Sequence, residues 1–284
     1  MENPSANVAP APTRLLGAAL PRAYLNYIGR QLLNLIDTIH GLGAFGLITL
    51  GVTVTKFNTA SRVIHPLIRV QIYLAGLRLL PVISFLGAAL GLVIIGQTVS
   101  LLTQVGAQEF VGTVMVTVVV RELGPLVTAL LVLARVGTAT VIELGTARAL
   151  GEVEALEALG IDPVHYLVVP RVLGLAISIF SLTVYLILIA LGSGYLFAFL
   201  QDVPLLPGDY FSQLALALRW QDFVLLALKT LSFGAVIAVV SCFQGLARPL
   251  RLEQVSEATT RAVMHSVVVC VLLDALFIVV YLLM

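Results

Sequence analysis

Four ionisable side chains, Arg121, Glu122, Lys229 and Asp274, stand inside long apolar runs of the sequence. A charge in apolar surroundings is costly, so one that is retained there normally binds a polar group, relays protons or pairs with an opposite charge. Adjacent residues on a helix point about 100° apart, so Arg121 and Glu122 do not simply neutralise each other. Each therefore needs a partner on another helix, in a second subunit or on a polar ligand.

Lys229 and Asp274 are predicted to form such a partnership. Lys229 comes six residues into one apolar run and Asp274 eleven residues into the next. If consecutive runs are antiparallel, the two residues come within about one helical turn in depth, which a lysine stem can reach. We therefore expect a pair across two helices, and its role is either purely structural or part of a site.

The apolar runs that hold these charges dominate the composition. Of 284 residues, 60% are hydrophobic and 11% charged, and the mean hydropathy is +1.06, whereas soluble domains are about 45–50% apolar and about 25% charged. These values exclude a water-soluble enzyme and a disordered chain, and a net charge of +1 argues against nucleic-acid binding. Cys242 and Cys270 lie in apolar runs and are interpreted as small buried hydrophobes.

Five apolar runs are long enough to cross a hydrocarbon layer of about 30 Å, which predicts an all-α, polytopic membrane protein. They are Leu79–Thr103, Phe110 to about Ala147, Val168–Leu200, Phe223–Phe243 and Val263–Met284. The second run would measure about 57 Å if it were straight, so it must bend, tilt or project from the membrane. Gly124 and Pro125 predict a kink within it.

The chain before these runs divides into two predicted regions. Residues 1–27 contain four prolines and resemble a flexible cytosolic tail. Residues 28–78 are predicted to be an interfacial amphipathic helix, over 28–57, and a connector; the alternative is a sixth span at Gly41–Thr55. Residues 79–284 then form a single five-helix transmembrane domain.

Lysines and arginines gather on one side of the five-span arrangement. The opposite side carries only Arg219, with Asp202, Asp209 and Asp222 in the same loop. Because positive loops are retained in the cytosol, we expect a cytosolic N-terminus and an extracytosolic C-terminus.

The loop between the second and third spans is predicted to hold a short amphipathic helix at about residues 150–160. Apolar Leu150, Val153, Leu156 and Leu159 recur at helical spacing, with Glu152, Glu154 and Glu157 between them. Gly160 is placed to end the helix, and Asp162-Pro163 prevents its resumption. The helix is either a solvated connector or a surface buried by a separate cytosolic protein, as in the membrane subunits of ABC transporters.

The sequence carries no catalytic or metal-binding motif of its own. Its four histidines are scattered, and neither Lys56 nor Lys229 stands in a phosphate-binding loop. We therefore expect a chain without a metal or other cofactor, which does not hydrolyse ATP by itself.

Several short motifs together resemble the MlaE family, the permeases of lipid-transporting ABC systems in bacteria and plastids. The motifs are Arg121-Glu122-Leu123-Gly124-Pro125, Ala134-Arg135-Val136-Gly137, Glu143-Leu144-Gly145, Arg148-Ala149, Glu154-Ala155-Leu156, Gly160-Ile161-Asp162-Pro163, Pro170-Arg171, Ala258-Thr259-Thr260-Arg261-Ala262-Val263 and Leu273-Asp274. The resemblance covers residues from about 28 to 284.

This resemblance implies a non-catalytic permease subunit that moves phospholipid, or a related lipid, between membranes. It implies a homodimer of permeases, cytosolic ATPase subunits that bind ATP and Mg, and an extracytosolic MCE-domain lipid-binding partner, in a bacterial inner membrane or a plastid inner envelope. By the resemblance, Arg121, Glu122 and Lys229 would lie near lipid headgroups. The segment Glu152–Leu159 would couple to the ATPase.

Two other functions are open from the residues alone. One is a proton-coupled secondary transporter that uses Glu122 or Asp274 as a proton relay. The other is a membrane scaffold without transport activity.

Overall fold

The computed structural model describes residues 40–53, 55, 61–107, 110–200, 207–246 and 251–283. The chain divides into two units, Met1–Phe45 and Gly46–Met284, and the arrangement described below is that of the second unit. The predicted tail over 1–27 and the first part of the predicted interfacial helix lie outside the described residues. The remainder of that helix is present as a short apolar helix, His40–Thr53.

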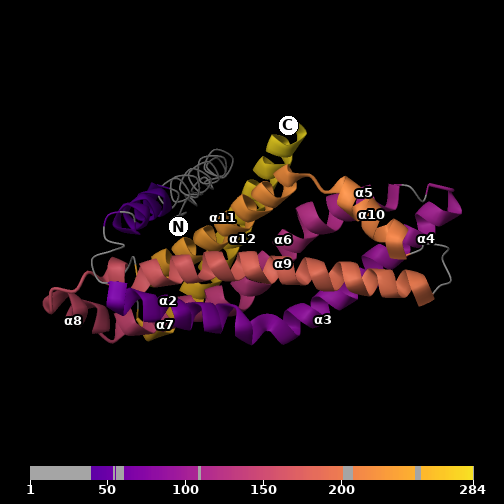
Figure 1. Cartoon of the computed structure of the whole chain (residues 1–284). Coiled ribbons are helices and arrows are strands. Elements are labelled where there is room, and N and C mark those ends of the chain that lie inside the picture. The colour runs from indigo at the N-terminus through magenta and orange to yellow at the C-terminus, as the bar shows by residue number, and fades with distance from the viewer. Residues whose placement is uncertain are drawn as a thin grey trace, which may run out of the picture. The chain divides into compact units, whose positions relative to one another are not determined.

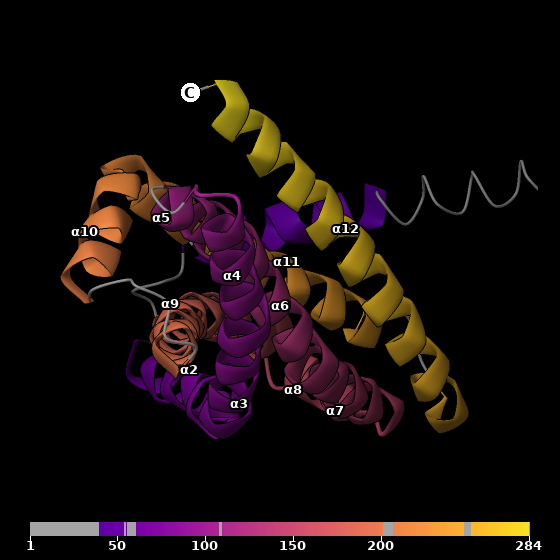
Figure 2. The same ribbon diagram turned by 90° about the vertical axis from the view of Figure 1, so that its right-hand side faces the viewer.

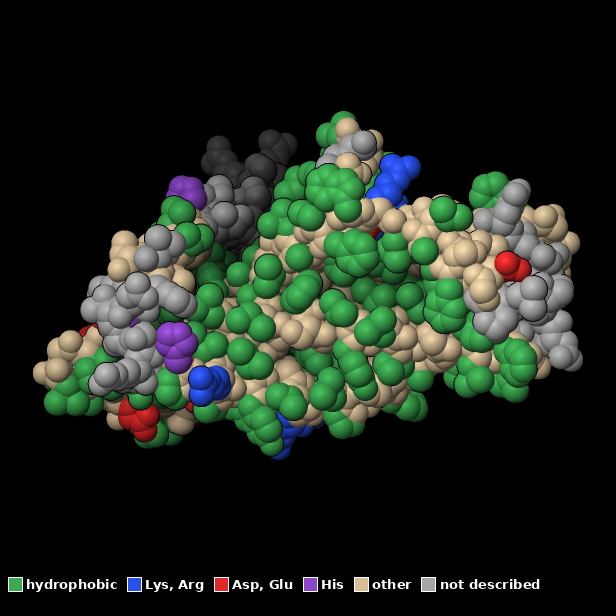
Figure 3. All heavy atoms as spheres, viewed as in Figure 1, with side chains coloured by type: hydrophobic (Ala, Val, Ile, Leu, Met, Phe, Trp, Pro, Cys, Tyr) green, Lys and Arg blue, Asp and Glu red, His purple; other side chains and the backbone are tan. Residues whose placement is uncertain are grey.

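The described chain is built of helices, as predicted, and contains five that are long and apolar enough to cross a membrane. They are Ile64–Leu102, Val111–Ala149, Val164–Phe197, Trp220–Leu246 and Leu252–Leu283, and we refer to them as spans 1 to 5. On the face shown in Figure 3, hydrophobic side chains are spread over the whole described surface and charged side chains are few. The protein is therefore a multi-pass membrane protein.

Span 1 begins earlier than the sequence indicated, because part of the expected connector is helical. Its elements are α2 (Ser61–Ala75), η1 (Leu77–Leu79), α3 (Leu80–Leu90), η2 (Gly91–Ile95) and α4 (Gly96–Gln104). Ile64 and Ala75 of α2 are buried, and α2 packs against α9 (Val169–Leu200). This burial stabilises an amphipathic helix whose hydropathy alone is too low to mark it as part of a span.

Glycines bring the backbone of span 1 into contact with α9. A Cβ atom on Gly91 would collide with Ser193 and Ala190, and one on Gly96 would collide with the ring of Phe197. Small residues permit this close approach of two helices in a membrane. The packing lies within one chain.

Span 2 contains the predicted irregularity around Pro125, in the form of π-helical turns. Its elements are α5 (Val111–Met115), η4 (Val116–Leu123), α6 (Gly124–Val132), η5 (Leu133–Gly137) and α7 (Thr138–Ala149). In η4, the Gly124 N–H donates to the carbonyl of Val119, five residues back. The wider turn ahead of Pro125 accommodates the missing proline N–H.

The remaining described elements follow span 2 along the chain. They are α8 (Glu152–Ala158), η6 (Val164–Val168), α10 (Pro207–Ala217), α11 (Trp220–Leu246), η7 (Leu252–Gln254) and α12 (Val255–Leu283). α9 packs against α2, α3, α6 and α11, and α10 packs against α5 (Figure 1). α12 contacts α11 and α7 and leaves most of its surface uncovered (Figure 2). Cys242 and Cys270 are buried free thiols, as the sequence indicated.

Candidate functional site

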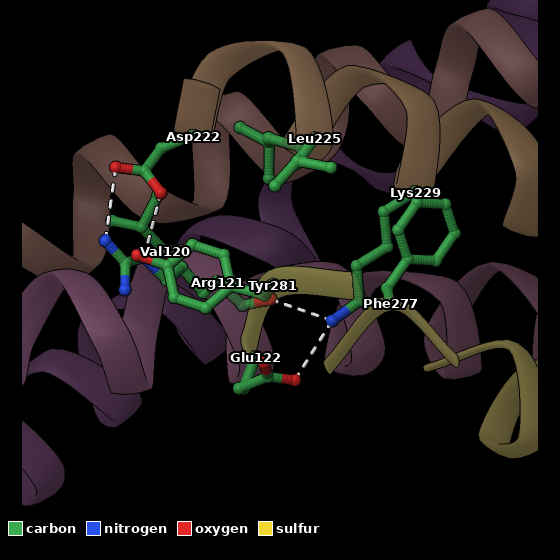
Figure 4. Close-up of a pocket in the computed structure, with 9 residues that line it drawn as sticks. Val120, Arg121, Glu122, Asp222, Leu225, Lys229, Phe277 and Tyr281 are labelled. Atoms are coloured by element: carbon green, nitrogen blue, oxygen red, sulfur yellow. Dashed lines mark hydrogen bonds and ion pairs between the residues drawn. The ribbon is translucent and has the colours of Figure 1, made fainter. Parts of the chain in front are cut away.

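Three of the four predicted intramembrane charges line one pocket between three helices (Figure 4), and the fourth, Asp274, pairs with one of them. η4 contributes Arg121 and Glu122, α11 contributes Lys229, and the last turns of α12 contribute Phe277 and Tyr281. The empty volume, counting the part open to the outside, is about 350 Å³. The sequence pointed to these charges but not to the aromatic wall that Phe277 and Tyr281 form.

Lys229 is the centre of the pocket's ion-pair network. Its Nζ lies 2.7 Å from Oδ1 of Asp274 and 3.0 Å from Oε2 of Glu122, and it donates to the main-chain carbonyl of Arg121 at 2.9 Å. An ammonium group has three hydrogens to donate, so these three acceptors match its capacity. The predicted Lys229–Asp274 pair across α11 and α12 is confirmed, and Glu122 has its partner in the same ammonium group.

The backbone acceptor of Lys229 is the carbonyl that Pro125 leaves open. In a regular α-helix, the N–H of residue 125 would donate to the carbonyl of Arg121, and proline has no N–H. Lys229 lies on a different helix, is 4% exposed and supplies the donor instead. The side chain that neutralises Glu122 therefore also satisfies the backbone at the irregular turn.

Arg121 is held by Asp222, which the sequence placed in the loop on the opposite side from most basic residues. Nε and Nη2 of Arg121 lie 2.9 Å and 3.3 Å from the two carboxylate oxygens of Asp222. Asp222 also accepts a bond from the N–H of Arg219, at 2.8 Å. An acidic residue in the first turn of a helix commonly has this capping role, and this signal could have placed Asp222 on α11.

Tyr281 completes the surroundings of Arg121. The Arg121 Cζ atom lies 3.9 Å from the centroid of the Tyr281 ring, a cation–π contact. Asp222 and Tyr281 together fix the guanidinium plane and leave the Nη1 group without a protein acceptor among the described residues.

The pocket is suited to binding an amphiphilic molecule. The side chains of Arg121 and Glu122 are 17% and 35% exposed, so a ligand can reach both, whereas Lys229 and Asp222 are almost inaccessible. Leu225 and Phe277 supply apolar walls. A phosphate accepts hydrogen bonds from a guanidinium group, and a carboxylate accepts them from an amine. The arrangement can therefore hold a charged headgroup beside apolar chains.

A second predicted feature, the amphipathic helix after span 2, is α8. Gly151 and Gly160 flank it with φ of 78° and 76°, in the left-handed region that favours glycine. The N–H groups of Gly160 and Ile161 donate to the carbonyls of Glu157 and Leu156, the arrangement of a Schellman helix end. Asp162 then accepts from the N–H of Val164 at 3.0 Å and begins the next helix.

The apolar residues of this segment divide between two surroundings. Val153 is buried in the chain's own structure, and Arg148 pairs with Glu154 at 3.2 Å, which fixes α8 against α7. Leu150 and Leu159 are 61% and 75% exposed, and Glu152 and Glu157 are exposed as well. The helix is therefore anchored on one side and presents an uncovered apolar and acidic surface.

Comparison with known proteins identifies related chains. Residues 68–280 match the family model described as Permease MlaE. The intermembrane phospholipid transport system permease protein MlaE of Haemophilus influenzae is 28% identical over 252 residues, which are 88% of this chain and 94% of that protein. A probable ABC transporter permease protein of Rickettsia prowazekii is 31% identical over 221 residues, 74% of this chain and 83% of that protein. The chloroplastic protein TRIGALACTOSYLDIACYLGLYCEROL 1 of Arabidopsis thaliana is 33% identical over 174 residues, 61% of this chain and 49% of that protein.

Proposed function

The chain belongs to the MlaE permease family, and on that premise we propose that it is the permease subunit of an ABC transporter that moves phospholipid, or a related lipid, between membranes. The relative from Haemophilus influenzae is named for intermembrane phospholipid transport, and the relative from Rickettsia prowazekii is named as an ABC transporter permease. The observation that carries the proposal is the pocket in which Arg121 and Glu122 are accessible between apolar helices.

In this proposal, Arg121, Glu122 and Lys229 bind the lipid headgroup through different roles. Arg121 donates to the phosphate through Nη1, which Asp222 leaves unused. Glu122 accepts from a polar or cationic part of the headgroup. Lys229 is almost inaccessible, so its role is to hold Glu122 in place, and Glu122 makes the direct contact with the headgroup. Leu225 and Phe277 contact the start of the acyl chains.

The size of the pocket supports a dimer of permeases. The space in it that a water-sized sphere can occupy is about 30 Å³, far below the roughly 300–1,000 Å³ of sites for drug-sized ligands, and a phospholipid is larger than such ligands. We therefore propose that a second copy of the chain supplies the remaining walls. The largely uncovered α12, which borders the pocket, is available for that contact.

The power for transport would come from separate cytosolic subunits. The sequence has no phosphate-binding loop, so ATP and Mg would be bound by an ABC ATPase that contacts Glu152, Glu154, Leu156, Glu157 and Leu159. An extracytosolic MCE-domain protein would exchange lipid with the permease. The chain itself is non-catalytic.

The proposed location is a bacterial inner membrane, with the N-terminus in the cytosol and the C-terminus outside. The distribution of lysines and arginines supports this orientation. The chloroplastic relative makes a plastid inner envelope the second location to consider.

Reconstitution tests the function directly. We would place the permease with its ATPase in liposomes and follow the transfer of a fluorescent phospholipid. Transfer should require ATP, and Arg121→Gln should abolish most of it, while Leu228→Gln, at an exposed position of α11, should not. Transfer by the permease alone, driven by a pH gradient without ATP, would instead support the proton-coupled transporter.

A further inference from the structure

Arg135 is exceptional among the basic side chains of spans 2 to 5. The others each lie within ion-pair distance of a carboxylate; they are Arg121, Arg148, Arg171, Lys229 and Arg261. Arg135 lies in η5, is exposed, and has no ion-pair partner in the described part of the chain. An unpaired arginine within a membrane helix normally marks contact with something outside that helix.

The depth of Arg135 indicates what it contacts. It follows Val111, the first residue of span 2, by twenty-four positions, which is about 36 Å along a helix. A bilayer has a hydrocarbon core of about 30 Å within a total thickness of about 40–45 Å. With Val111 at one boundary of the core, Arg135 reaches the headgroup layer on the far side. Arg121 is fourteen positions earlier, or about 21 Å.

A break in span 1 supports this depth. Gly76 lies against Ser178 of α9, and Gly124 lies against Ile187 of the same helix. Ser178 and Ile187 are nine positions apart on α9, which is about 14 Å along the helix axis. Along span 2, Arg135 lies about 17 Å from Gly124, in the direction that leads from Ile187 to Ser178 on α9. Arg135 is thus at nearly the same depth as Gly76, the residue between the amphipathic α2 and the rest of span 1. Because amphipathic helices are typical of the membrane surface, this depth corresponds to the headgroup layer.

Span 2 of a second copy does not offer a suitable carboxylate at this depth, and Glu257 of span 5 already pairs with Arg261. In a two-fold dimer whose axis is normal to the membrane, each residue meets partner residues of its own depth. The nearest acidic side chains of span 2 are Glu143, about 12 Å away along the helix, and Glu122, about 20 Å away. Both already pair with basic side chains, Arg171 and Lys229. A dimer that formed through the face of span 2 that carries Arg135 would bring the two Arg135 side chains together, and their repulsion would need an anion between them.

We infer that Arg135 binds the phosphate of a phospholipid in the leaflet on the far side of the membrane from Val111. The small, exposed Ala134 and Ala139 leave the guanidinium group open, and this group binds phosphate with two parallel hydrogen bonds. Towards the membrane centre, the partly buried Leu131 and Val127 lie one and two turns away, where the acyl chains begin. The site depends on the membrane-spanning arrangement and does not require the transport activity.

Photo-crosslinking from the next turn tests this site alone. We would replace Ala139 with benzoylphenylalanine in the full complex, in nanodiscs of phosphatidylethanolamine and phosphatidylglycerol, and identify the adducts by mass spectrometry. A phospholipid adduct is expected. In an Arg135→Gln background its yield should fall about five- to tenfold, since one arginine near anionic headgroups contributes about 1 kcal/mol or more. Arg135→Lys should restore part of the yield, and Thr138→Gln should not lower it.

Three outcomes would overturn the inference. The first is an equal phospholipid yield with Arg135→Gln. The second is an adduct with a protein that disappears in that variant, which would assign Arg135 to a partner's carboxylate. The third is loss of the adduct on adding millimolar inorganic phosphate, which would assign the site to the free anion. A transport assay on Arg135→Gln is separate, because loss of transport with an unchanged adduct concerns the proposed function and not this site.

Discussion

Lys229 donates to the main-chain carbonyl of Arg121, across 2.9 Å between α11 and η4. The same ammonium group pairs with Glu122 and with Asp274 on α12. One side chain therefore joins the irregular turn before Pro125, an accessible acidic group and the last helix of the chain. Displacing Lys229 would alter all three together, which gives the pocket a mechanical connection to α12.

Replacing Lys229 by methionine should destabilise the protein and stop lipid transfer. The change removes the charge at similar length and leaves Asp274 and the Arg121 carbonyl without their donor. Breaking a buried ion pair in this way costs about 3–5 kcal/mol, so thermal unfolding in detergent should occur several degrees lower. Leu228→Met, at the neighbouring exposed position, is the matched control. An unchanged unfolding temperature for Lys229→Met would contradict the described network.

The pair between Lys229 and Asp274 should appear as coupling between two substitutions. In a cycle of Lys229→Met, Asp274→Asn and the double variant, we expect the double variant to lose less stability than the two single losses combined. Contacting residues typically couple by about 0.5–3 kcal/mol. Unfolding in a denaturant series, with all four proteins in one detergent, measures this difference. Additive losses would show that the two side chains act independently.

Asp222 should be required for positioning Arg121 beyond its role as a helix cap. Asp222→Asn keeps an oxygen that can accept from the Arg219 N–H but removes the charge that pairs with Arg121. We expect this variant to retain most of its stability and to transfer lipid poorly. Asp222→Ala should lose about 1 kcal/mol more through the missing cap.

Tyr281→Phe is the control for this comparison, because it keeps the aromatic ring over the guanidinium group. Its transfer rate should stay near that of the unmodified protein. If Asp222→Asn also transfers lipid at the normal rate, then Arg121 does not need its carboxylate partner for function.

The uncovered part of the segment around α8 should bind the ATPase without contributing to the permease fold. Leu159→Asp changes a side chain that is 75% exposed, so the unfolding temperature should not change, while co-purification of the ATPase and its stimulated activity should fall. Val153→Asp alters the buried side of the same helix and should lower the unfolding temperature. Normal ATPase association with Leu159→Asp, and likewise with Glu154→Arg/Leu156→Asp, would show that coupling lies elsewhere.

The parts of this fold that follow from local sequence were predictable, and those set by helix rotation were not. Apolar length gave the five spans, and antiparallel depth was enough to pair Lys229 with Asp274. The end of α8 followed from Gly160 because left-handed backbone favours glycine. By contrast, the partner of Arg121 depended on the rotation of α11 about its axis, which the sequence does not encode locally. The position of Asp222 in the first turn of α11 could have been inferred locally, but its contact with Arg121 could not.

Burial accounts for the other differences. The composition of α2 predicts a connecting segment. Its packing against α9 shows that it is the beginning of span 1. Val153 and Leu159 belong to the same apolar repeat, yet one is buried and the other exposed. The repeat identifies the helix, whereas tertiary contacts decide which of its residues are available to a partner.

The glycine contacts of span 1 with α9 limit how the molecule can move. Side chains from both helices normally separate two packed backbones and allow small sliding movements, but at Gly91 and Gly96 only α9 supplies them, through Ser193 and Phe197. Span 1 and α9 should then move together as one rigid unit. Any change between inward and outward access to the pocket would have to come from movement of the other helices. α12, with little of its surface covered within the chain, is the span that the other described helices hold least.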